Sequence, residues 1–133
     1  MLRQLTKKTR AGFTLVEIMI VVAIIALLAA IAVPGFLRAR KRSQASKILN
    51  DLRLISSAMD QYAIEAGKKG GDNIDVADWT KYLKKSTNLE ATGADLFGNA
   101  YGPQSVDGLP KLSTNSYNAL SDVTDGAFWS PYQ

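Results

Sequence analysis

The fold of this 133-residue chain is decided by residues 13–37, which read FTLVEIMIVVAIIALLAAIAVPGFL. Glu17 is the single charged residue in this stretch, and twenty uncharged residues, 18–37, follow it. At about 1.5 Å per residue, a helix of that length spans a hydrocarbon layer of about 30 Å. A buried helix of a small soluble domain needs apolar residues on one face only. The stretch therefore predicts a membrane-spanning helix, with an unusually apolar soluble helix as the alternative.

Positive charge flanks the apolar run on both sides. Residues 38–42, which follow it, read RARKR. The first twelve residues contain four cations and no acid: Arg3, Lys7, Lys8 and Arg10. Without those four, the 16 Lys and Arg residues of the chain fall to 12, which equals the number of acidic residues. The net charge of +4 thus belongs to the N-terminal segment. Nucleic acid is not expected as a primary partner.

The helix is expected to continue beyond the apolar run. Apolar side chains recur there at spacings of three and four and form one helical stripe: Ile48, Leu52, Ile55, Met59, Tyr62 and Ala66. Charged side chains fall off this stripe: Asp51, Arg53, Asp60 and Glu65. Glycines after Ala66 end the pattern, so one helix is predicted from about Phe13 to Ala66. Pro34 predicts a kink, because it lacks a backbone donor.

The remaining residues, 67–133, predict a small mixed region. Asp75 is a plausible N-cap for a short helix over Val76–Lys85. Strands are expected at Ala100–Val106, Leu109–Thr114 and Ala127–Tyr132, the first two joined at Asp107-Gly108. The predicted fold class is α+β: a long N-terminal helix, half membrane-embedded and half amphipathic, packed against a small antiparallel sheet with a short extra helix. The sheet should cover the apolar stripe, and a coiled-coil dimer is the alternative.

The composition argues against an enzyme. There is no cysteine and no histidine, which excludes thiol nucleophiles, histidine-based triads, disulfides and Cys/His zinc sites. Nucleotide-binding and metalloprotease motifs are also missing from the sequence. About sixty residues around one helix leave little room for a catalytic pocket.

The hexapeptide Gly12-Phe13-Thr14-Leu15-Val16-Glu17 joins the basic segment to the apolar run. With the basic leader, the length of the run and Pro34, it resembles the signal of the type IV pilin superfamily, which includes the pseudopilins of type II secretion. The resemblance covers residues 7–40. It implies a cleaved leader (1–12), a transmembrane and assembly helix (13–37), the amphipathic half of the same helix (38–66) and a small globular α+β region (67–133).

The resemblance also implies how the N-terminus is processed. A prepilin peptidase would cut between Gly12 and Phe13, and the new amine of Phe13 would be N-methylated. The alternative is ordinary signal-peptide cleavage after Ala30-Ile31-Ala32. Glu17 and the cations at 38–42 argue against that alternative.

Glu17 has two possible roles. A carboxylate at bilayer depth costs about 2.5 kcal/mol or more unless it is paired. The resemblance implies that Glu17 pairs with the Phe13 amine of a neighbouring subunit and so sets the register of a filament. Alternatively, Glu17 only stabilises the first helical turn, where the macrodipole favours anions by about 0.3–1 kcal/mol.

The resemblance implies a structural subunit of a helical filament. The segment Asp95–Tyr101, DLFGNAY, resembles a motif of major pseudopilins, and the lack of cysteine separates the chain from many disulfide-closed pilins. A type II secretion pseudopilin is therefore the leading prediction. The alternatives are a type IV pilin of a surface pilus for motility, adhesion or DNA uptake, and a membrane-anchored binding module that never polymerises.

The expected partners and location follow from the same resemblance. The partners are other copies of the chain, the prepilin peptidase, an inner-membrane assembly platform, minor pilins or pseudopilins, and membrane lipid. The subunit would cross a bacterial inner membrane once, with its C-terminal region in the periplasm, and would then join an extracytoplasmic filament.

Major pseudopilins often bind calcium in an acidic C-terminal loop, and the resemblance makes Asp122 and Asp125 the candidates here. Two carboxylates are few for an ion that takes 6–8 oxygen ligands. Both residues are better explained as ordinary aspartates of turns. Neither a metal nor another cofactor is therefore assigned.

Overall fold

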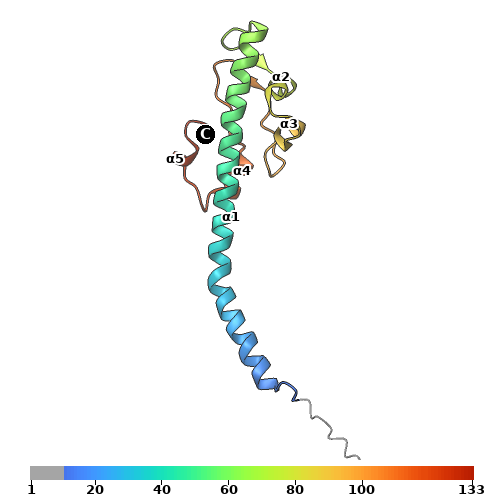
Figure 1. Ribbon diagram of the computed structural model, residues 1–133. Coiled ribbons are helices and arrows are strands. Elements are labelled where there is room, and N and C mark those ends of the chain that lie inside the picture. Colours follow the sequence, from blue (N-terminus) through green and yellow to red (C-terminus); the bar gives the residue numbers. More distant parts are fainter. Residues whose placement is uncertain (1–10) are drawn as a thin grey trace, which may run out of the picture. The chain divides into compact units, whose positions relative to one another are not determined.

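The computed structural model describes residues 11–133 (Figure 1). Its longest element is helix α1, Leu15–Ala66, with 52 residues. The helix begins two residues later than expected, because Thr14 caps its first turn, and it ends at the predicted residue. Gly67 then takes a φ of 62°, a left-handed conformation that stops helices at low steric cost.

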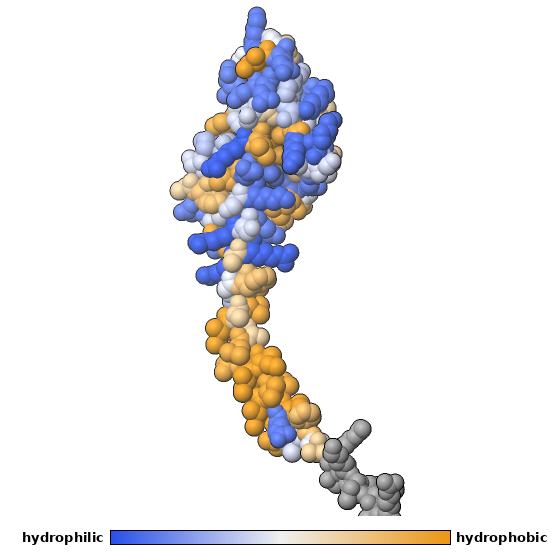
Figure 2. Space-filling view, in the orientation of Figure 1, coloured by the Kyte–Doolittle hydropathy of each residue, from blue (hydrophilic) through white to orange (hydrophobic). Residues whose placement is uncertain are grey.

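The chain divides into two units, one that ends at Leu37 and one that comprises Arg38–Gln133. In the first unit, the apolar side chains of α1 are exposed on every face. Figure 2 shows the apolar surface on the face turned to the viewer. Within the described residues, one helix window is long and apolar enough to cross a membrane, and none of it is buried by protein. The predicted apolar run is therefore a helix whose side chains need a non-aqueous partner.

The second unit surrounds the C-terminal half of α1 with short elements. After α1 these are β1 (Asn73–Ile74), α2 (Val76–Trp79), the 3-10 helix η1 (Thr80–Tyr82), α3 (Asn88–Thr92), β2 (Gln104–Ser105), α4 (Thr114–Leu120) and α5 (Gly126–Trp129). The strands β1 and β2 pair antiparallel, with Asn73 opposite Ser105 and Ile74 opposite Gln104. The α+β class is confirmed.

The core of the second unit is built on the predicted stripe of α1. Four of its six residues are buried: Ile48, Leu52, Ile55 and Met59. They cluster with apolar side chains from the short elements, above all Ile74, Trp79, Leu89, Leu120 and Trp129. The chain itself covers the stripe, as expected. Short helices and loops provide most of this cover, whereas the sequence predicted that a sheet would. Asp51 is also buried, because the segments packed on α1 extend past the edge of the stripe.

The predicted hairpin is wrong. Asp107-Gly108 does form a turn, in which the Gly108 N–H donates to the Ser105 carbonyl at 2.9 Å. However, β2 pairs with the earlier strand β1 and not with the segment that follows the turn. The backbone N–H of Val106 also donates to the carbonyl of Asp72 at 2.8 Å. The segment expected as the second arm contains Pro110, which has no N–H for a ladder, and it leads directly into α4.

Two further local predictions need correction. The third strand is instead helix α5, because the Asp125 side chain accepts a hydrogen bond from the Phe128 N–H (2.9 Å) and caps a helical turn. The helix expected over Val76–Lys85 ends at Trp79 and continues as 3-10 turns to Tyr82. Its start is confirmed, since Asp75 is the N-cap.

Candidate assembly site

The predicted cleavage site lies in extended chain ahead of α1. Phe13 is 88% exposed, and a Cβ built on Gly12 meets no heavy atom within 4 Å. Among the described residues, no side chain packs against either residue of this predicted cleavage site. The leader cations predicted to flank it lie at residues 1–10, outside the described residues.

Thr14 and Glu17 hold the start of α1 by reciprocal hydrogen bonds. The Thr14 N–H donates to Oε2 of Glu17 at 2.9 Å, and the Glu17 N–H donates to Oγ1 of Thr14 at 3.2 Å. This is the pattern of a capping box, which satisfies two of the free amide groups of a helix start. Within the described residues, no further hydrogen bond or ion pair reaches the Glu17 carboxylate. A carboxylate has about four lone-pair sites, so acceptor capacity remains.

Pro34 lies inside α1 and does not interrupt it. The helix runs through residues 30–38 without a break. A kink at this position stays a prediction.

The segment singled out by its DLFGNAY sequence is organised around Asp95. This carboxylate is 1% exposed, and its Oδ1 accepts hydrogen bonds from the backbone N–H groups of Phe97 (2.9 Å) and Asn99 (3.0 Å). Its Oδ2 accepts from the Ser116 hydroxyl of α4. An isolated antiparallel bridge, Ala94 to Ala100, closes the base of the loop. The aspartate thus ties the loop to α4, a role that the sequence pattern did not reveal.

The two aspartates considered for calcium have other partners. Oδ2 of Asp122 lies 2.7 Å from Nζ of Lys41, and this contact lowers the pKa of the Asp122 carboxyl. Asp125 caps α5. Within residues 11–133, no group of three or more histidine, cysteine, aspartate or glutamate side chains is placed to hold a metal ion.

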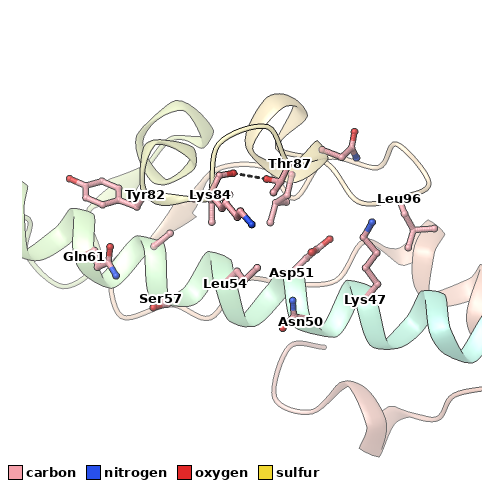
Figure 3. A pocket seen from close by; sticks show the side chains of 14 residues that line it. Lys47, Asn50, Asp51, Leu54, Ser57, Gln61, Tyr82, Lys84, Thr87 and Leu96 are labelled. Carbon is pink, nitrogen blue, oxygen red and sulfur yellow. Dashed lines mark hydrogen bonds between the residues drawn. The ribbon is translucent and has the colours of Figure 1, made fainter.

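A pocket of about 500 Å³ opens between α1 and the segment that carries η1 and α3 (Figure 3). Lys47 and Asp51 point into it from α1, and Lys84 lies on the opposite wall. Burial raises the pKa of the Asp51 carboxyl, and Lys47 partly offsets this. Burial, together with Asp51 and Asp95, also raises the pKa of Tyr101, whose buried hydroxyl has no hydrogen-bond partner among residues 11–133. The sequence analysis did not group the pocket residues Lys47, Asp51 and Lys84, because Asp51 lies beside the apolar stripe.

A comparison with protein families supports the resemblance of the N-terminal segment to the type IV pilin signal. Residues 7–33 match the family model described as prokaryotic N-terminal methylation motif. This range includes Gly12, Phe13 and Glu17 and ends next to Pro34.

Relatives extend the similarity into the second unit. The chain is 38% identical over 94 residues to the type IV major fimbrial protein FimA of Dichelobacter nodosus, covering 71% of this chain and 56% of that protein. It is 30% identical over 110 residues to the type II secretion system core protein G of Pseudomonas aeruginosa, covering 71% of this chain and 73% of that protein. The type IV major pilin protein PilA of Myxococcus xanthus is 46% identical over 54 residues, 41% of this chain and 24% of that protein.

The chain spans about half the length of the fimbrial proteins that it matches. No solved structure matches it significantly. The three relatives named above are a fimbrial protein, a secretion system core protein and a pilin protein, in agreement with the expectation that the chain is not an enzyme. The methylation motif, the apolar helix that carries it, and the secretion protein matched over nearly three quarters of its length show that this chain belongs to the type IV pilin superfamily.

Proposed function

We propose that the chain is the structural subunit of a helical filament of the type II secretion pseudopilus kind. Its subunits would be processed by prepilin peptidase at Gly12-Phe13 and would polymerise through α1. Before assembly, the subunit would sit in the inner membrane with residues 38–133 on the periplasmic side. An assembly platform and minor pseudopilins would be its other partners.

The single observation that carries the pseudopilin assignment is the relative named type II secretion system core protein G. Its alignment covers 73% of that protein and 71% of this chain, which is more than the membrane helix alone can supply. Two sequence features agree: the chain has no cysteine, and the loop that begins at Asp95 has a pseudopilin-like sequence. The buried Asp95 gives that loop a structural purpose, since it anchors the loop to α4.

A type IV pilin of a surface pilus is the second candidate. The similarity to the fimbrial protein of Dichelobacter nodosus is higher in identity, 38% against 30%, although it covers a smaller part of the relative.

The proposed assembly mechanism centres on Glu17. Its contacts with Thr14 engage one carboxylate oxygen, so the other can accept a hydrogen bond from the Phe13 amine of an adjacent subunit. In hydrocarbon an unpaired carboxylate is costly, and a matched amine relieves that cost in one register only. Apolar packing between the exposed faces of neighbouring α1 helices would supply the remaining attraction.

Two experiments test the proposal. Intact-mass measurement on the membrane-extracted protein should give a mature chain that begins at Phe13, and an uncut Met1 or a start at Val33 would contradict the processing step. Deletion of the gene in its own host should leave secreted enzymes in the periplasm while surface pili persist. Loss of surface pili with normal secretion would instead favour the surface-pilus candidate.

A further inference from the structure

The second unit begins with a group of cations that the proposed function does not use. These are Arg38, Arg40, Lys41 and Arg42, here called the basic collar. Residues 18–37, directly before it, carry no charge, and Asp51 is the first acid after it. The three arginines are exposed, and no ion pair among the described residues includes any of them.

The collar encircles the helix. At about 100° per residue, Arg40 points about 200° away from Arg38, and Arg42 points about 40° away from it. Figure 2 shows hydrophilic side chains on both sides of the helix where the second unit begins. A surface that docks one protein partner is confined to one side of a helix, whereas a ring of charge suits a medium that surrounds the helix.

Lys41, the fourth cation of the collar, forms an ion pair within the chain. Nζ of Lys41 lies 2.7 Å from Oδ2 of Asp122. The charge of Arg38 makes a smaller contribution to the lowered pKa of this carboxyl. No ion pair among the described residues includes Arg40 or Arg42, although Arg42 lines one surface pocket with Asp122 and Asp125. Arg38 and Arg42 are four residues apart on one helix face, where like charges repel, so an external anion between them would be favourable.

We infer that the basic collar binds the phosphate groups of anionic phospholipids around the outer end of the membrane helix. Long arginine side chains can reach headgroups while their stems lie along apolar surface. The guanidinium group also matches phosphate with two parallel hydrogen bonds. This inference rests on the membrane anchoring included in the proposed function, and it adds a lipid class and the residues that select it.

The test uses the full chain, purified in a mild detergent with equal amounts of phosphatidylglycerol and phosphatidylcholine. Native mass spectrometry counts the lipids of each kind that one subunit retains. The wild type should retain phosphatidylglycerol in excess, and added salt should reduce the excess. Each cation near an anionic surface contributes roughly a fivefold preference, so Arg38→Gln/Arg40→Gln/Arg42→Gln should lower the preference by on the order of a hundredfold.

Matched variants isolate the position of the charge. Lys68→Gln/Lys69→Gln/Lys111→Gln removes three exposed cations elsewhere in the second unit and should keep the preference. Arg38→Lys/Arg40→Lys/Arg42→Lys keeps the charge and should preserve most of it. An unchanged preference in the glutamine collar variant would overturn the inference, as would an equal loss in the Lys68 control. Loss of multimers without loss of lipid preference would assign the collar to subunit contacts instead. A wild-type chain that retains neither lipid and does not enter membranes would refute the anchoring itself, a failure distinct from lost selectivity.

Discussion

Lys41 and Asp122 are 81 positions apart in the sequence, yet Nζ of one lies 2.7 Å from Oδ2 of the other. The contact ties the loop between α4 and α5 to the part of α1 where the second unit begins. Because Asp125 caps α5 immediately beyond, the loop is held at both ends. Asp122 and Asp125 therefore hold the loop between α4 and α5 in place.

The ion pair should make a pH-dependent contribution to stability. Lys41 holds the pKa of Asp122 below its ordinary value of 3.8. The contribution is therefore present above pH 3.8 and is lost as the pH falls through the lowered value. Asp122→Asn should cause a small decrease in Tm at pH 7, which fades on acidification below pH 3.8. A double-mutant cycle with Lys41→Ala measures the coupling, and strictly additive effects would contradict it.

Asp51 should show the opposite pH dependence. Burial raises the pKa of its carboxyl above 3.8, so ionisation of this group opposes folding. Stability from this group is complete below pH 3.8 and declines as the pH rises through the raised value. Asp51→Asn should therefore raise Tm at pH 7, and the gain should vanish in acid. The exposed Asp60→Asn is the control, and a lower Tm for Asp51→Asn at pH 7 would show that its charge is favourably paired.

Asp95 should be the most sensitive polar residue of the second unit. Asp95→Ala leaves two backbone N–H groups and the Ser116 hydroxyl without their acceptor, and each buried unsatisfied group costs about 1–3 kcal/mol. We expect a loss of about 3 kcal/mol or more by denaturant unfolding in detergent. Ser116→Ala should cost less, because the two backbone contacts remain. Equal losses for the two variants would contradict this division.

Two leucines on α1 provide a test of the core. Leu52 is fully buried, whereas Leu54 is 46% exposed. Leu52→Ala should reduce the free energy of unfolding by about 2–5 kcal/mol. Leu54→Ala should change it by about 0.5 kcal/mol. If both substitutions have the same effect, the stripe is not oriented as described.

Three variants at the start of α1 separate helix capping from subunit pairing. Glutamine can replace glutamate in a capping box but carries no charge. If pairing with Phe13 drives assembly, Glu17→Gln should give a partial loss of filaments and Glu17→Ala a nearly complete one. Thr14→Ala, which removes only the cap, should assemble almost normally. Sheared filaments are compared with subunits left in the membrane fraction. Normal filaments from Glu17→Ala, with the leader still cut, would refute the pairing.

The sequence by itself determined the long helix, its apolar and amphipathic halves, its end at Ala66 and the N-terminal motif. These features depend on residue periodicity and on local chemistry, such as the glycines after Ala66. Tertiary structure decided which strands pair, because the two-residue strands β1 and β2 are too short to have a pattern of their own. It also decided the contact of Lys41 with Asp122 and the burial of Asp51 and Asp95. Contacts between residues far apart in the chain form only when packing on α1 brings them together, and no local signal in the sequence encodes them.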